Sequence, residues 1–193
     1  SLLYNQLDVL NEDYRRTNKD TTKTRTIFKD RAGDTRFQFV LASTDDSGNP
    51  TSGIVRKYTT RTSFFNGSLQ QYMKYDADGG DDAWDPQEYL NIWVCDLSYQ
   101  GQDLLLGFAY PPYGHPYWPF TEWVSDPNQG VVLHYKIVGR NNPLANSGVL
   151  LACKKGRTAT HEVGHYLGLR HIWGDGGTGS CGSDDYIFDT PKQ

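Results

Sequence analysis

The segment that decides the fold is His161-Glu162-Val163-Gly164-His165-Tyr166-Leu167-Gly168-Leu169-Arg170-His171. On a helix, His161 and His165 lie on one face, about one turn apart, because they are four residues apart. Both imidazoles can then reach one tetrahedral zinc ion at about 2.0–2.1 Å. Glu162 lies about 100° around the helix from His161, where its carboxylate can contact a water molecule held by the metal.

The third histidine requires a bend in the chain. On a continuous helix, His171 would lie roughly 15 Å along the axis from His161. Gly168 can adopt the left-handed conformation that ends a helix, so we expect the chain to turn back and bring His171 to the same metal. Three protein ligands leave a fourth position for water, which is typical of catalytic zinc. The alternative is a polar helix face that ends at a capping glycine, and chance would produce this pattern with odds on the order of 10⁻⁵.

The motif resembles a known clan. Residues 161–171 are similar to the long zinc-binding consensus HExxHxxGxxH of the metzincin metalloproteases, and the following Ile172-Trp173-Gly174-Asp175 is similar to the pappalysin family within it. Further stretches similar to that family are residues 7–18, 37–42, 89–94 and 189–191. The resemblance implies an α+β, metzincin-like catalytic domain. It would have a twisted, mostly parallel mixed sheet of five strands and two main helices, with the zinc helix at the base of the cleft.

One feature of that clan is missing. Metzincins carry a methionine-containing turn after the zinc motif, whereas the one methionine of this chain is Met73. We expect residues 1–193 to form a single catalytic domain whose C-terminal subdomain is largely missing. Its N-terminal subdomain would span about 1–168, and about 169–193 would begin the C-terminal subdomain. The methionine turn would then be trimmed away or supplied by a second chain.

Hydrophobic periodicity predicts the individual elements. Steps of three and four residues predict a helix over 2–16, and the zinc helix should span about 156–167. Alternating or continuous apolar runs predict strands. The expected strands are 37–41, 53–60, 89–97 as a central strand buried on both faces, and 130–138 as an edge strand that could pair with an extended substrate.

Composition excludes several classes of protein. A net charge of −4 offers no electrostatic footprint for nucleic acid, and no apolar run is long enough to span a membrane. Ser1 opens a mature-looking sequence without a signal peptide, which fits a secreted protein after processing. Of the three cysteines, Cys95 lies in an apolar run and is expected to be buried. The resemblance implies a disulfide between Cys181 and a cysteine in the missing C-terminal part.

A second metal site is predicted after the zinc motif. Flexible backbone with hard oxygen ligands suits calcium, although composition alone leaves a solvated acidic turn equally open. The resemblance favours calcium, with Asp185 and the Thr190 carbonyl as its main ligands. The full candidate set is Asp175, Asp184, Asp185, Asp189 and Thr190.

These observations predict a secreted zinc-dependent endopeptidase that acts on proteins or peptides, with Glu162 as general base. Two alternatives remain: a zinc-bearing binding module without catalysis, and a non-catalytic zinc- and calcium-binding fragment of such a protease. The aromatic loop 110–120 could line a substrate rim or simply pack on itself. His115 and His134 are interpreted as ordinary histidines rather than further ligands.

Overall fold

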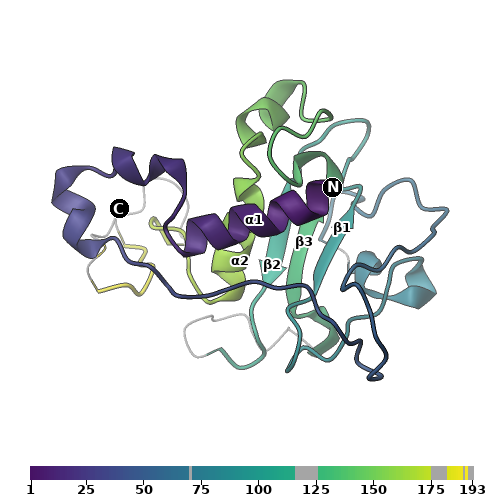
Figure 1. Cartoon of the computed structure of the whole chain (residues 1–193). Coiled ribbons are helices and arrows are strands. Elements are labelled where there is room, and N and C mark those ends of the chain that lie inside the picture. The colour runs from purple at the N-terminus through teal and green to yellow at the C-terminus, as the bar shows by residue number, and fades with distance from the viewer. Residues whose placement is uncertain (70, 116–125, 175–181, 189, 191–193) are drawn as a thin grey trace.

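Two helices and a small sheet position the site in the computed structural model (Figure 1). The structure describes residues 1–69, 71–115, 126–174, 182–188 and 190. Short 3₁₀ turns connect the main elements. These elements are α1 (Leu2–Tyr14), β1 (Ile92–Cys95), β2 (Gly107–Tyr110), β3 (Gly130–His134) and α2 (Arg157–Tyr166).

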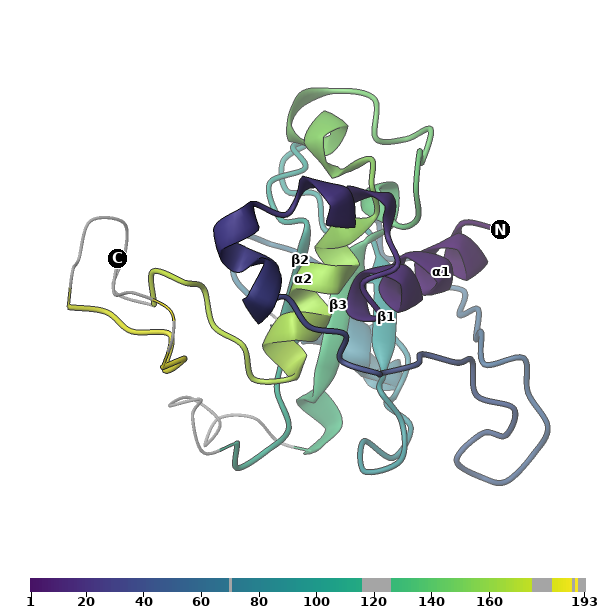
Figure 2. The ribbon, with the colours of Figure 1, turned by 60° about the vertical axis from the view of Figure 1, so that its left-hand side comes forward.

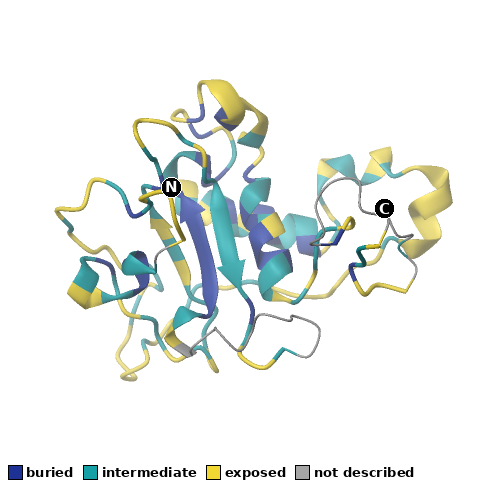
Figure 3. Ribbon diagram, turned by 180° about the vertical axis from the view of Figure 1, so that it is seen from behind, coloured by how far each residue is buried: buried dark blue, intermediate teal, exposed yellow. Residues whose placement is uncertain are grey.

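The sheet is mixed, as expected, and has the strand order β1-β3-β2. β1 pairs with β3 in parallel, and β2 pairs with β3 antiparallel, with Gly107 opposite Leu133 and Tyr110 opposite Gly130. All five residues of β3 are buried, and Figure 3 shows the strand dark blue along its length. β3 is therefore the central strand of the described sheet.

The predicted positions of two strands are wrong. Residues 130–138 were expected at an edge and 89–97 at the centre, but β3 is central and β1 lies at an edge. The alternation in 130–138 places Val132 and His134 on one face of the strand, and both side chains are fully buried. Val132 packs in a second apolar cluster, and His134 is bonded through Nε2 to Asp103 at 2.9 Å. Both faces of β3 are thus covered.

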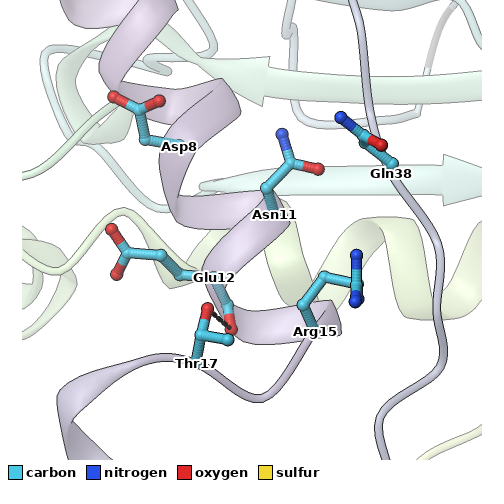
Figure 4. A pocket seen from close by; sticks show the side chains of 6 residues that line it. All are labelled: Asp8, Asn11, Glu12, Arg15, Thr17 and Gln38. Atoms are coloured by element: carbon cyan, nitrogen blue, oxygen red, sulfur yellow. Dashed lines mark hydrogen bonds between the residues drawn. The ribbon is translucent and has the colours of Figure 1, made fainter.

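Two further predicted strands, 37–41 and 53–60, are also wrong, because neither segment forms a strand. The Asn11 side chain on α1 explains the first. Its amide donates to the Phe39 carbonyl at 2.9 Å and its oxygen accepts the Phe39 N–H at 2.7 Å, so the backbone is satisfied without a neighbouring strand. Figure 4 shows the depression between α1 and this segment, with Asn11 and Gln38 on its two sides. The described sheet accordingly has three strands instead of the five that the resemblance implied.

The helices cover one face of the sheet. α2 packs on β2 and β3, and α1 crosses α2 (Figures 1 and 2). Gln6 on α1 uses both ends of its buried amide here, donating to the Gly156 carbonyl at 2.9 Å and accepting the Gly139 N–H at 2.8 Å. The Tyr14 hydroxyl donates to the Thr160 carbonyl on α2 at 3.1 Å. These bonds fix the angle at which the two predicted helices meet.

The opposite face of the sheet holds a buried lysine. The Lys74 side chain is fully buried, and its ammonium lies 5.1 Å from the ring centroid of Trp93, 5.5 Å from that of Phe108 and 4.7 Å from that of Tyr110. It also donates to the carbonyl of Asn128. Burial lowers the pKa of Lys74 to about 7, because a charge in this apolar setting loses its hydration.

The remaining structural expectations have mixed outcomes. Cys95 and Cys153 are free cysteines; Cys95, which was expected to be buried, is half-buried, and desolvation raises its pKa to about 12. Cys181 lies outside the described residues, so its disulfide stays a prediction. Within the described ranges, no helix is both long and apolar enough to cross a membrane.

Candidate metal centre

α2 ends at Tyr166, and Gly168 follows two residues later, where the sequence places the bend. Gly168 has φ of 91° and donates its N–H to the His165 carbonyl at 2.9 Å. The Leu169 N–H donates to the Gly164 carbonyl, also at 2.9 Å. This pair of bonds is the Schellman arrangement, which needs a left-handed residue at its centre. The chain then reverses and carries His171 back toward the helix.

The three predicted histidines come together at their Nε2 atoms. The separations are 3.0 Å between His161 and His165, 3.2 Å between His165 and His171, and 3.3 Å between His161 and His171. Ligands of a tetrahedral zinc ion with bonds of 2.0–2.1 Å are about 3.3 Å apart. The donor set and its spacing therefore fit zinc.

Two neighbours orient these rings. The Nδ1 atom of His165 lies 2.8 Å from the Leu169 carbonyl, and since a carbonyl only accepts, Nδ1 carries the proton and Nε2 keeps its lone pair. The indole of Trp173 stacks on the His171 ring, with centroids 4.6 Å apart and planes 4° from parallel. Burial lowers the pKa of His161, and the charges of the other two histidines add to this effect. The neutral form that binds metal is thereby favoured.

Glu162 points to the sheet side of α2. It is 7% exposed, and a side chain built at Gly107 of β2 would meet its Cγ at 3.0 Å. Burial raises the pKa of Glu162 to about 7. A cation beside it would favour the carboxylate and counteract this effect. The carboxyl group thus lies between the histidine helix and the edge strand β2.

Several contributors to the site escaped the sequence reasoning. Trp173 was used only for the family resemblance, although its place two residues after His171 offered a signal. For Gly107 the signal is the alternation of small and aromatic residues in Gly107-Phe108-Ala109-Tyr110. His115, interpreted as ordinary, has its ring against Gly168: a Cβ built there would lie 2.3 Å from its Nε2. Much of the aromatic loop, residues 116–120, lies outside the described residues.

Three of the five predicted calcium ligands lie in the described part of the chain, and two of these, Asp184 and Thr190, line one depression. Asp184 and Asp185 are each bonded through Oδ1 to the backbone N–H two residues later, at 2.9 Å. Asp175 and Asp189 lie outside the described residues, and Thr190 is half-buried. Among residues with a described placement, the histidine trio is the one grouping of three or more His, Cys, Asp or Glu ligand atoms. Calcium binding stays a prediction.

Comparison with known proteins agrees with this geometry. Residues 141–193 match the model of peptidase family M43, described as pregnancy-associated plasma protein-A. Mature mirolysin of Tannerella forsythia, solved with a cleaved peptide, superposes with a TM-score of 0.83 at 44% identity, covering 99% of this chain. The resemblance to the pappalysin family is confirmed. The metzincin-like fold is confirmed by the same superposition.

Curated relatives of the chain are named extracellular metalloproteases. One from Arthroderma gypseum is 28% identical over 193 residues, and one from Arthroderma benhamiae is 54% identical over 104 residues. The chain spans 48% and 32% of those two proteins, and 64% of the mature mirolysin chain. It thus corresponds to about half or less of these curated relatives.

Proposed function

We propose that this chain carries the catalytic centre of a secreted zinc endopeptidase. The observation that supports the proposal most directly is the convergence of the three Nε2 atoms, 3.0–3.3 Å apart, where the helix with two of the histidines also carries the buried Glu162. His161, His165 and His171 would hold the ion. When bound, zinc lowers the pKa of a water ligand toward 7 and polarises a carbonyl group.

Glu162 would act as the general base. Its carboxylate would accept a proton from the attacking water and then deliver it to the leaving amine. Burial between α2 and β2 leaves Glu162 only 7% exposed, which keeps the carboxyl away from bulk solvent. A purely structural zinc site has no use for such a group, which argues against the binding-module and non-catalytic-fragment alternatives.

An extended peptide would pair with β2 rather than with β3. Strand addition was predicted for residues 130–138, but β3 already has a neighbouring strand on each side. β2 is an edge strand of the described sheet, and it packs on the helix that carries Glu162. Backbone hydrogen bonds from a free edge would hold a substrate without requiring particular side chains. The cleaved peptide bound to mirolysin is consistent with a protein of this fold that binds peptides.

The remaining predictions concern the division of the chain into subdomains, a second chain and calcium. We propose that residues 1–193 form one unit, with an N-terminal subdomain to about 168 and the start of a C-terminal subdomain from 169. A second chain that supplies the rest stays a prediction, as does calcium.

The decisive experiment replaces Glu162 by Gln. Zinc content should be unchanged, whereas hydrolysis of a peptide library should fall at least about 100-fold, because general acid–base catalysis supplies roughly that much. Glu88→Gln, at an exposed glutamate, is the matched control and should retain full activity. Near-normal hydrolysis by the Glu162 variant would contradict the mechanism. Hydrolysis by the unaltered protein that survives complete zinc removal would contradict the metal's role.

A further inference from the structure

Gly107 is not required by the backbone at its position. It opens β2 opposite Leu133, and its φ lies outside the left-handed region, so any residue could adopt this conformation. Glycine in a strand interior normally costs stability relative to alanine. The reason for glycine here must therefore be the space that a side chain would occupy.

That space is filled by two groups. A Cβ atom at residue 107 would lie 2.9 Å from the Val132 carbonyl oxygen, 3.0 Å from Cγ of Glu162 and 3.3 Å from its Oε1. All three separations are shorter than ordinary van der Waals contact. The Glu162 side chain is 7% exposed, so it has little room to move aside.

The other residues of β2 also have small side chains on the face toward α2 and large side chains on the opposite face. Ala109, two residues on and so on the same face, packs with the core that includes Val163 of α2. Phe108 belongs to the cluster on the other face. Small residues thus face the helix and large ones face away, which lets the carboxyl of Glu162 lie directly against the strand.

We propose that Gly107 is a positioning residue for Glu162. This inference rests on the proposed function of Glu162 as general base. The absent side chain admits the carboxyl group to the edge strand, where a paired peptide would present its scissile bond. A methyl group at residue 107 would displace the carboxyl and leave the three histidines in place.

The kinetic test compares Gly107→Ala with Gly33→Ala. Gly33 is exposed, has nothing within 4 Å of its Cβ position and lies outside the left-handed region, so its variant should behave as the unaltered protein. For Gly107→Ala, kcat should fall about tenfold or more while KM and zinc content stay unchanged, because the base is misplaced rather than the metal. An unchanged kcat would overturn the proposal.

A second test needs no activity. The loss of melting temperature caused by Gly107→Ala is measured with Glu162 present and again in a Glu162→Ala background. Two of the three short contacts disappear in that background, so the loss should shrink to about half or less. An equal loss in both backgrounds would assign the clash to the Val132 carbonyl and overturn the proposal. If the unaltered protein proves inactive, the proposed function fails, while this comparison still decides whether Gly107 accommodates Glu162.

Discussion

Replacing Lys74 by Met should change how the stability of the protein depends on pH. The ammonium of Lys74 is fully buried among Trp93, Phe108 and Tyr110. Its pKa is about 7 in the folded chain, against an ordinary value of 10.5. The unfolded chain therefore binds more protons between these two values, and the free energy of unfolding must rise with pH across that window.

The size of the effect follows from the two pKa values. At pH below 7 the buried ammonium costs roughly 5 kcal/mol relative to an exposed lysine. Raising the pH from 6 to 9 should remove about 3 kcal/mol of this cost. The three ring faces favour the charged form, so about 3 kcal/mol is an upper bound. Met keeps most of the apolar stem and cannot titrate, so the variant lacks this contribution.

The assay is urea denaturation of the metal-free protein at several pH values between 6 and 9. The two proteins share all other titrating groups. The contributions of those groups cancel when the unfolding free energy of the variant is subtracted from that of the unaltered protein. The unaltered protein should gain stability relative to Lys74→Met as the pH rises. Lys29→Met, at an exposed lysine, should show no such trend relative to the unaltered protein. A difference that stays constant from pH 6 to 9 would refute the burial argument, whichever protein is more stable overall.

Two further substitutions test the support of the metal centre. Trp173→Ala should weaken zinc affinity about tenfold in competition with a chromophoric chelator, because the ring that stacks on His171 is lost, while Trp173→Phe should retain most of it. An alanine variant with native affinity would remove Trp173 from this role. Gly168→Ala should lower the free energy of unfolding by at least about 1–2 kcal/mol, from the left-handed φ of 91°, with an added cost from overlap with the His115 ring. Adding His115→Ala to the Gly168→Ala variant should restore only the stability lost through overlap with the His115 ring. Full recovery of the unfolding free energy would contradict the backbone explanation.

The strands show most clearly what hydrophobic periodicity in the sequence cannot predict. The alternation in 130–138 is real, but the face that carries Val132 and His134 was interpreted as part of an edge strand. A second cluster built from Phe64, Met73 and Leu97 covers that face, and nothing local to 130–138 announces it. Residues 37–41 have the same alternation and form no strand, because an asparagine from α1 takes the backbone hydrogen bonds of Phe39. In both cases a distant segment decides the outcome.

The order of residues alone determined the histidine cluster, because all three histidines lie within eleven positions of helix and turn. Helical pitch sets the spacing of His161 and His165, and the left-handed freedom of Gly168 sets the return of His171. Tertiary structure decided what surrounds that centre. Which strand is central, which edge is free and why Glu162 can lie against β2 all depend on contacts across tens of residues. Those contacts arise from packing, so no short window of sequence contains them.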